Sequence, residues 1–433
     1  MSKVINLRDP VHDLIRVECP IIIELMESQA FQRLRRIRQL GLAYLTYPGA
    51  EHSRFTHSLG AYHLALRMAD SLNQNAGKEI ITTEERKALG IAGLIHDIGH
   101  GPFSHLFEKI TEKYIGKKEA HHETWGKRIL AEDSQLQKIV KQNKELFNLV
   151  QKIFDKLYRP IVADIISSEL DADRFDYLLR DSKMTGVHYA NLDLTWILRC
   201  LVPAEVKILG KPQEVLALDG RRGISVVESY VLGRHYMYKH VYYHKTTRAA
   251  EQMLRNALQY ATNQIADGTM AAPHPFFKEL ADKKPSLENY LKLDDFLLLG
   301  YIDQWSEKSD DLGKLCARLR QRQIFKTFSY PDEFEMGRAE ESLKEIRNIA
   351  KEKGFNPDLF VILDDPSDIA IKSPTYLKKK GKESKYQPLY FVEPTGTTTE
   401  LAQSGSFVNT LNYRERRIHV PEELLNDVKD VWK

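Results

Sequence analysis

Histidine and aspartate gather in one short stretch of this sequence. Residues 92–105 read AGLIHDIGHGPFSH, which places His96, Asp97, His100 and His105 close together. Neutral imidazoles and ionised carboxylates are ligands for divalent transition metals, and imidazoles also transfer protons near neutral pH. Because His96 and Asp97 are adjacent, on a helix they diverge by about 100° and share one ion only at a seam between helices. A metal site here therefore needs ligands from other parts of the chain.

Candidates for those ligands lie on both sides of the stretch. His57 falls on an earlier predicted helix, one turn after Arg54. The later segment SSELDADRFDYLLRD, residues 167–181, supplies acids in an apolar context; these are Glu169, Asp171, Asp173 and Asp176. The spacing leaves two interpretations open. Either these groups converge on a metal, or His57 packs in the core while Asp171 and Asp173 cap the start of a helix.

Helices must position these groups. Residues 54–73 carry apolar side chains at three- and four-residue spacing, which predicts an amphipathic helix. Residues 83–100 open with Thr83 as the expected N-cap and then become apolar nearly all round, as in a helix that crosses the core. Residues 161–182 predict one helix or a close pair, and 224–261 a long helix with Gly233 as its weak point.

The pattern of apolar residues changes after about residue 320. Strands are predicted from β-branched and aromatic residues, and an amphipathic helix that ends near Gly354 lies between the first two. The expected strands are 322–330, 358–365 and 386–393, the helix is 337–354, and the basic segment 372–386 is an expected loop. The sequence thus predicts a mainly α protein, with a helical core at 1–320 and a smaller α/β lobe at 321–433.

Composition limits the classes of function. The chain has 433 residues, of which 42% are hydrophobic and 28% charged, and a formal charge of +3. This near balance argues against nucleic acid as the main ligand. The three cysteines are far apart in sequence, the N-terminal segment has no apolar core, and no run is long and apolar enough for a membrane span. We expect a cytoplasmic protein with reduced cysteines.

Several motifs carry a family resemblance. They are FQRLRRIRQLG at 31–41, GAEHSRFTHSLG at 49–60, HDIGHGPFSH at 96–105, DADRFDYLLRD at 171–181 and YYHK at 242–245. In this order they resemble the HD-domain deoxynucleoside triphosphate (dNTP) triphosphohydrolases, over about residues 1–330. The resemblance implies an HD-domain helical core and a metal-dependent hydrolase.

The resemblance also implies roles for individual residues. The metal ligands would be His57, His96, Asp97 and Asp173. Two imidazoles and two carboxylates leave open positions on a divalent ion such as Mn, Mg, Fe, Ni or Zn. The residues implied in acid–base chemistry and phosphate contact are His100, His105, Glu108 and His122, with Glu108 orienting one of the histidines.

In the family, water attacks the α-phosphorus of a dNTP and the whole triphosphate leaves. Arg54, Arg174 and Arg234 match positions that contact the phosphates. The residues implied to enclose the deoxyribose are Gln39 and Asp181 at the 3′-hydroxyl, and Leu40, Tyr177 and Tyr242 at the sugar edge.

Regulation is implied in the same way. Relatives form homo-oligomers activated by bound nucleotides such as dGTP, and the residues near their contacts are Gln32, Arg35, Arg222 and Lys245. The sequence departs from the pattern at KVINLRDP, residues 3–10, where the spacing from the lysine to Asp-Pro is longer, and an acidic regulatory residue aligns with Glu27 only across a gap. The sequence therefore does not decide which base activates the enzyme, or whether the oligomer is a tetramer or a dimer.

Two alternatives are weighed against dNTP hydrolysis. The first is an HD phosphohydrolase that acts on another nucleotide, either a monophosphate or a signalling nucleotide. The second is a nucleotide-binding regulator without catalysis. The sugar-enclosing set argues against the first, and the intact metal-ligand set argues against the second.

Overall fold

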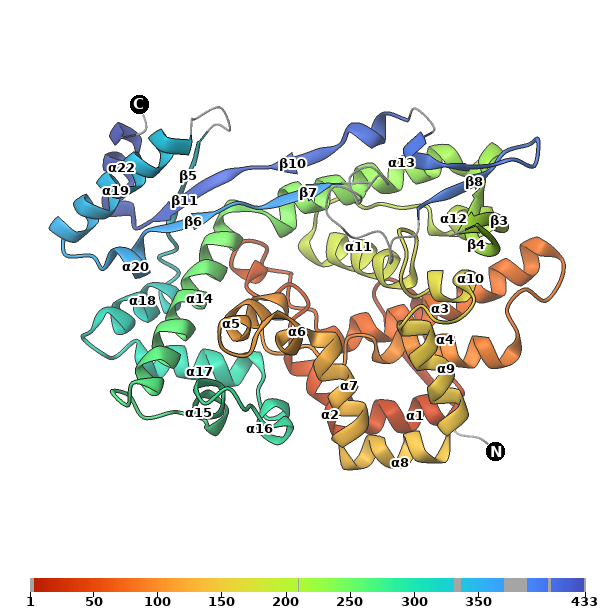
Figure 1. Cartoon of the computed structure of the whole chain (residues 1–433), viewed down its shortest axis with the longest axis horizontal. Coiled ribbons are helices and arrows are strands. Elements are labelled where there is room, and N and C mark those ends of the chain that lie inside the picture. The colour runs from red at the N-terminus through yellow and green to blue at the C-terminus, as the bar shows by residue number, and fades with distance from the viewer. Residues whose placement is uncertain (1–3, 209, 331–335, 370–387, 404–405, 432–433) are drawn as a thin grey trace.

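The computed structural model describes residues 4–208, 210–330, 336–369, 388–403 and 406–431 (Figure 1). Helices dominate these residues and several small sheets accompany them, so the prediction of a mainly α fold is confirmed. The expected basic loop 372–386 lies outside the described residues.

Five helices carry the candidate site. They are α3 (Arg54–Ala76), α4 (Thr83–Ile95), α5 (His105–Ile115), α7 (His122–Glu132) and α11 (Ala172–Thr185). Helix α3 packs against both α4 and α11. A Cβ atom on Gly93 of α4 would lie 2.9 Å from the carbonyl oxygen of Ala61, so glycine lets the α3 and α4 backbones approach closely.

The start of α4 differs by one residue from the prediction. Its N-cap is Thr82 and not Thr83, because Thr82 has the extended backbone that a cap needs. The Thr82 hydroxyl accepts from the Glu85 amide at 3.2 Å, and the Glu85 carboxylate accepts from the Thr82 amide at 2.8 Å. This capping box contributes about 1 kcal/mol of stability.

The remaining helices of the core enclose these five. The segment predicted as one helix or a pair is a pair, α10 followed by α11. The enclosing helices are α1 (Pro20–Glu27), α2 (Gln29–Gln32), α6 (Lys117–Ala120), α8 (Ser134–Gln142), α9 (Lys144–Phe154), α10 (Pro160–Asp164), α12 (Leu194–Cys200), α15 (Pro275–Ala281), α16 (Leu287–Leu291), α17 (Asp295–Trp305) and α18 (Asp311–Arg320).

The long helix predicted at 224–261 is interrupted, but not at Gly233. Helix α13 (Gly220–Met237) continues through Gly233, where a Cβ would lie 2.7 Å from the carbonyl oxygen of Tyr189, so this glycine serves close packing. The interruption is a π-helical turn, Tyr238–Tyr242, closed by the Tyr243 amide on the Tyr238 carbonyl, before α14 (Lys245–Ala266).

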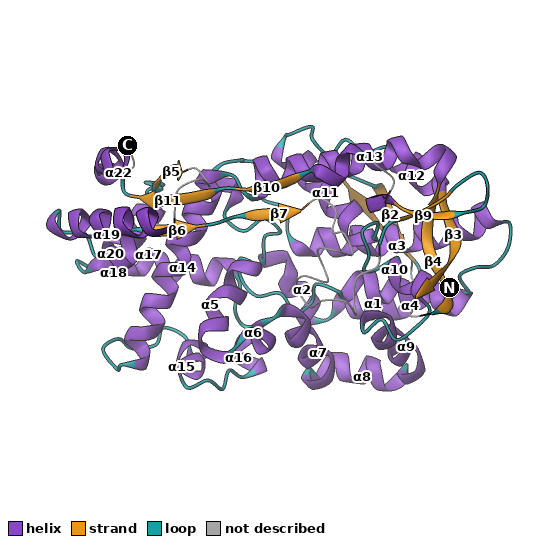
Figure 2. Cartoon of the chain, turned by 45° about the horizontal axis from the view of Figure 1, so that its top comes forward, coloured by secondary structure: helices purple, strands orange, loops and turns teal. Residues whose placement is uncertain are grey.

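Two hairpins in the first half of the chain were not predicted. Strands β1 (Ile5–Asp9) and β2 (Asp13–Val17) pair antiparallel, as do β3 (Leu201–Ile208) and β4 (Lys211–Asp219). The expected strand at 386–393 is β8 (Tyr390–Val392), and it pairs with β4 rather than with the C-terminal strands. Adding β9 (Thr398–Glu400) gives a sheet of order β3–β4–β8–β9, on the right in Figure 2.

A smaller sheet and two helices form the far end of the molecule (Figure 1). Its strands are β5 (Lys326–Tyr330), β11 (Arg416–Val420) and β6 (Ile362–Asp364), with β11 in the middle and antiparallel to both. They share a small apolar core with α19 (Met336–Glu352) and α22 (Leu425–Val431). Strands β7 (Ser367–Ile369) and β10 (Asn412–Arg414) form a separate ribbon beside them.

The strand predicted at 358–365 is only half strand. Its first part is a short helix, α20 (Pro357–Phe360), and β6 follows. Asn356 caps the helix by accepting from the Asp358 amide at 3.1 Å, and proline at the first helical position favours the same turn.

The three cysteines form no disulfide, in agreement with the expectation that they are reduced. Cys19, Cys200 and Cys316 are all free. Among the described helices, none has both the length and the apolar character that crossing a membrane would require.

Asp164 makes stability depend on pH. One oxygen of this buried carboxyl accepts the Leu216 amide at 3.1 Å and the other has no partner among the described residues. Burial raises its pKa to about 7, although the Leu216 amide and the Lys156 charge favour ionisation. The unfolded chain releases this proton near pH ~4. Stability therefore falls as pH rises from about 4 to about 7, by up to about 4 kcal/mol for this group.

We expect Asp164→Asn to remove that part of the pH dependence. Thermal unfolding of both proteins at pH 4 to 8 measures it. The variant should be the less stable protein at acid pH, and the difference should shrink or reverse by pH 8. Parallel stability profiles would contradict the raised pKa.

Candidate metal centre and adjoining cavity

The four expected metal ligands come from three helices. His57 lies in the first turn of α3, His96 is the C-cap of α4 with Asp97 directly after it, and Asp173 lies in the first turn of α11. The apolar residues of α4 are buried against its neighbours, so the end of the helix lies in the interior. His96 and Asp97 therefore lie where α3, α4 and α11 meet.

The structure brings these four side chains together. His57 Nε2 lies 3.3 Å from His96 Nε2, 3.0 Å from Asp173 Oδ1 and 3.7 Å from Asp97 Oδ2. His96 Nε2 lies 3.4 Å from Asp97 Oδ1 and 3.5 Å from Asp173 Oδ1. His57, His96 and Asp97 present donor atoms that all lie within 4.8 Å of one another, which suits one divalent ion, and Asp173 adds a carboxylate beside both imidazoles.

Hydrogen bonds orient both imidazoles. His57 Nδ1 lies 2.8 Å from Asp176 Oδ2, and His96 Nδ1 lies 2.8 Å from the Gly93 carbonyl oxygen. Each ring then carries its proton on Nδ1 and presents the Nε2 lone pair to the shared space, which is the tautomer that binds a metal.

The charges around the centre keep the carboxylates ionised. Burial opposes ionisation of Asp97, but Arg54 and His96 hold its pKa well below its usual range. Burial alone would lower the pKa of His57, whereas hydrogen bonds to Asp173 and Asp176 raise it to about 10. A metal must therefore displace a proton from His57, and metal affinity should rise with pH.

A second group of imidazoles surrounds Glu108. Its Oε1 lies 2.6 Å from His122 Nδ1, 3.4 Å from His105 Nδ1 and 3.6 Å from His100 Nδ1. Hydrogen bonds from His105 and His122 outweigh burial and lower the pKa of Glu108. Glu108 thus contacts all three histidines and not only the one that the resemblance implied.

The histidines in this group differ in exposure. Burial, together with the charges of Arg54 and His122, lowers the pKa of His100 well below its usual value, so its ring is neutral. The His105 side chain is 66% exposed and reaches the adjoining cavity. His105 is therefore the histidine of this group best placed to exchange a proton with a bound molecule.

A strained turn carries the chain from His100 to His105. Phe103 and Ser104 have φ angles of 53° and 58°, in the left-handed region. Two contacts hold the turn: Asp295 accepts from the Phe103 amide at 2.8 Å, and Arg54 Nε donates to Ser104 Oγ at 2.6 Å.

Each of the three candidate phosphate-binding arginines is held by an acid. Arg54 pairs with Asp97, Arg174 donates to Glu169 at 2.9 Å, and Arg234 lies 3.2 Å from a carboxylate oxygen of Asp368 on β7. All three guanidinium groups line the same cavity of about 810 Å³.

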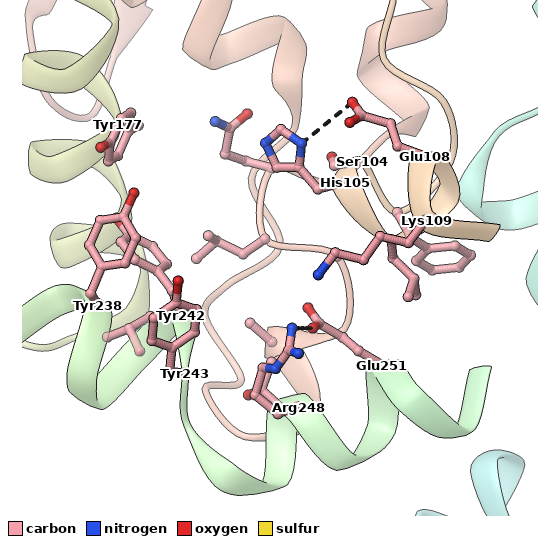
Figure 3. A pocket seen from close by; sticks show the side chains of 18 of the residues that line it. Ser104, His105, Glu108, Lys109, Tyr177, Tyr238, Tyr242, Tyr243, Arg248 and Glu251 are labelled. Carbon is pink, nitrogen blue, oxygen red and sulfur yellow. Dashed lines mark hydrogen bonds and ion pairs between the residues drawn. The ribbon is translucent and has the colours of Figure 1, made fainter. Parts of the chain in front are cut away.

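The candidate sugar-binding residues line that cavity as well. They are Gln39, Leu40, Tyr177, Asp181 and Tyr242. The Tyr242 hydroxyl donates to Asp181 at 2.9 Å, and the Tyr177 and Tyr242 rings meet edge to face. Figure 3 shows the tyrosines on one side of the cavity, with His105 across from them. A smaller cavity of about 340 Å³, lined by His96, Asp97, His100 and His122, shares Arg54, His105 and Asp173 with it.

The candidate regulatory residues lie elsewhere. Gln32 accepts from Arg35 Nε at 2.8 Å, and Arg35 lies over the Phe55 ring. Arg222 and Lys245 are exposed near the starts of α13 and α14. Across the described ranges, no hydrogen bond or ion pair joins Gln32 or Arg35 to either of them. None of the four lines the two cavities above.

Sequence reasoning missed several contacts. His52 lies 2.7 Å from Asp181, and His12 lies 2.7 Å from Asp176. Asp176 was noted only as one acid among several, although its position one turn after Asp173 places both on one face of α11. Asp171 is the N-cap of α11, as the second interpretation expected, because it accepts from the Arg174 amide at 2.7 Å.

Two family models cover much of the chain. The HD domain matches residues 54–181 and the HD associated region matches residues 212–417. The uncharacterized protein YwfO of Bacillus subtilis is 34% identical over 427 residues, which span 97% of this chain and 93% of that protein. This chain belongs to the HD-domain family.

Two further relatives of this HD-domain protein carry more specific names. The Dictyostelium discoideum homolog of the deoxynucleoside triphosphate triphosphohydrolase SAMHD1 is 29% identical over 334 residues, 75% of this chain and 60% of that protein. The crystal structure of a phosphohydrolase from Bacteroides thetaiotaomicron matches with a TM-score of 0.78 and 26% identity, over 97% of this chain and 100% of that one. The family is one of metal-dependent phosphohydrolases.

Loss of a ligand should release the metal. We expect His96→Ala and Asp97→Ala to weaken binding of Mn²⁺ by at least about 10–100-fold, since even residues that only orient a ligand have effects of that size. His188→Ala is the matched control, because that exposed imidazole belongs to none of the described histidine and acid groups that could hold a metal. Elemental analysis after equilibration in buffered metal measures the binding. Wild-type affinity in His96→Ala would show that the ligand set is wrong.

Proposed function

We propose that this protein hydrolyses dNTPs to a deoxynucleoside and inorganic triphosphate. One observation carries the proposal: the cavity that contains three arginines and the polar set around Asp181 is lined by Asp173, and it shares Arg54, His105 and Asp173 with the smaller cavity lined by His96 and Asp97. A polyanion bound by the arginines would have its reacting phosphorus beside that cluster. The SAMHD1 homolog that matches this chain is named for the same reaction.

The metal centre assigns the place of reaction. His57, His96, Asp97 and Asp173 would hold a divalent ion, either Mn, Mg, Fe, Ni or Zn. When bound, such an ion supplies Lewis acidity to a phosphate oxygen and to water. Arg54 contacts Asp97 and also lines the cavity, so its guanidinium bridges the ligand cluster and the α-phosphate position.

Arg174 and Arg234 would bind the part of the triphosphate that extends away from the metal centre. Arg174 and Arg234 are each braced by a carboxylate, which fixes the guanidinium before substrate arrives. Positively charged donors that are already in place stabilise the negative charge of the triphosphate while water attacks its α-phosphorus. Displacing the acid from such a pair has a cost, so part of the binding energy is spent on that exchange.

The reaction balances as a hydrolysis. A water oxygen bonds to the α-phosphorus and that water releases one proton to solvent. The bond from the phosphorus to the 5′-oxygen breaks, and the 5′-oxygen takes a proton from the protein, which is restored from solvent. We assign the proton donor to His105, whose ring faces the cavity and is oriented by Glu108. Glu108 is the acid that would support a charge on His105, and it is itself held by His122, on which His100 stacks with ring centroids 3.9 Å apart.

Selection of a deoxyribose rests on the polar and aromatic residues that line the cavity. Asp181 is fixed by His52 and Tyr242, and the Gln39 side-chain oxygen has no partner among the described residues. These groups suit a 3′-hydroxyl. Leu40 and the edges of Tyr177 and Tyr242 suit a sugar carbon without a hydroxyl, because burying an unpaired hydroxyl there would be unfavourable.

The proposal extends to regulation and setting. A homo-oligomer, either dimer or tetramer, would bind an activating nucleotide such as dGTP through Gln32, Arg35, Arg222 and Lys245. A cytoplasmic location would supply the dNTPs. The four residues lie on the surface or near it, where a second subunit could reach them.

Product analysis tests the activity. Purified protein is incubated with each dNTP, alone and in pairs, with Mn²⁺ or Mg²⁺. We expect deoxynucleoside and inorganic triphosphate, with Asp97→Ala as the inactive control. Stimulation in mixed pairs would indicate an activating nucleotide. Absence of both products in every mixture would contradict dNTP hydrolysis. Release of phosphate in a parallel incubation with nucleoside monophosphates would then favour another nucleotide substrate.

The sugar contact gives a second test. Gln39→Ala should lower kcat/KM for dGTP about tenfold, the value of one hydrogen bond to the 3′-hydroxyl. The 3′-deoxy analogue ddGTP lacks that hydroxyl, so its kcat/KM should hardly change. Gln142→Ala, at an exposed position on α8, is the control. An equal loss for both nucleotides would contradict the assignment of Gln39.

A further inference from the structure

The turn of the N-terminal hairpin reaches the metal centre from outside the matched HD domain. Between β1 and β2, Asp9 Oδ1 accepts from the backbone amides of Val11 and His12, each at 2.9 Å. These two bonds shape the turn. They also direct the His12 side chain inward, where it is only 1% exposed.

His12 meets the carboxylate that orients a metal ligand. His12 Nε2 lies 2.7 Å from Asp176 Oδ1, while Asp176 Oδ2 lies 2.8 Å from His57 Nδ1. The Asp176 side chain is fully buried. The carboxylate therefore joins two imidazoles, one from the hairpin and one from the metal site, and a rotation of Asp176 would move both contacts.

Arg180 closes the arrangement into a ring. Its Nε and Nη2 donate to Asp176 at 2.8 and 2.9 Å, and its Nη1 and Nη2 donate to Asp9 at 2.9 and 3.2 Å. The turn, His12, Asp176 and Arg180 thus form one connected, buried network. Such networks are rigid when every member is paired.

The helix that carries His57 leaves room for this network. A Cβ atom on Gly60, in the next turn of α3, would lie 1.8 Å from Asp176 Oδ1 and 2.6 Å from Arg180 Nη2. No larger residue fits there without displacing Asp176. His63 packs on the His12 ring with centroids 5.1 Å apart, but it has no hydrogen bond to Asp176 within the described part of the chain.

We propose that His12 is a positioning residue, which acts through Asp176 to hold His57 in its metal-binding orientation, with Asp9 and Arg180 fixing both. The N-terminal hairpin is then part of the metal centre, although it ends at Val17 and the HD-domain match begins only at residue 54. This inference rests on the metal centre of the proposed function and not on the identity of the substrate.

Metal affinity without substrate tests the proposal. We expect His12→Ala to weaken Mn²⁺ or Co²⁺ binding about 10–100-fold, as other residues that orient a metal ligand do. His12→Gln keeps an N–H donor and should recover most of the affinity. His63→Ala removes a neighbouring ring without touching Asp176 and should bind as the wild type does.

The Co²⁺ absorption spectrum separates positioning from simple docking of the hairpin. We expect the spectrum of His12→Ala to change, since the ligand geometry changes, and that of His63→Ala to match the wild type. If folded His12→Ala shows wild-type affinity and spectrum, the network only anchors the hairpin and the proposal is wrong. If His12→Ala does not fold, the variants His12→Gln and Asp9→Asn test the proposal instead. Metal affinity that is lowered in Asp9→Asn but not in His12→Gln would support the positioning role of His12. Unchanged affinity in both variants would overturn it.

A lack of dNTP hydrolysis would not produce these results. If His12→Ala weakens metal binding while no dNTP is cleaved by the wild type, the proposed reaction fails and the positioning role of His12 stands. If dNTPs are cleaved and metal affinity is the same in all variants, the reverse holds.

Discussion

The carboxylate of Asp97 is the group on which the rest of the site depends. One oxygen meets Arg54 and faces His57, and the other lies 3.4 Å from His96 and 3.3 Å from His100. A buried charge is tolerated only while such partners surround it, and removing one partner of a buried pair costs about 3–5 kcal/mol. The cluster of His57, His96, Asp97 and Asp173, the cavity lined by Arg54 and the imidazole group around Glu108 therefore all depend on the charge of Asp97.

Local patterns in the sequence predicted much of this arrangement. The periodicity of α3 and α4 and the adjacency of His96 and Asp97 are short-range features, and the helices follow them. The predicted helix boundaries were wrong where a shift of one residue, or a contact with a distant segment, decides where a helix begins or ends. Thr82 and Thr83 are equally good caps by type, and only the reach of Glu85 selects Thr82. The turn after α13 depends on packing that periodicity does not encode.

The contacts between distant segments could not be predicted from the same patterns. Asp368 lies on a strand after α20 yet meets Arg234 in the cavity, and Asp364 on β6 accepts from Arg248 of α14. Each pairing joins residues more than a hundred positions apart, and nothing in their local sequence marks the partner. The β3–β4 hairpin does carry a strand signal, since Val206, Ile208 and Val215 are β-branched, but the prediction attended to helical periodicity and overlooked it. Burial of the partners, visible only in the fold, distinguishes these acids from solvated ones.

The π-helical turn between α13 and α14 constrains how this region can change over evolution. The π turn ends α13, and α14 starts anew from His244, whose backbone is not helical. Tyr242 in the turn and Arg248 in the first turn of α14 both line the cavity. Substitutions inside the turn alter one side chain at a time, whereas deletion of a single residue would change where α14 begins relative to Tyr242. The length of this segment is thus a stricter requirement than its composition.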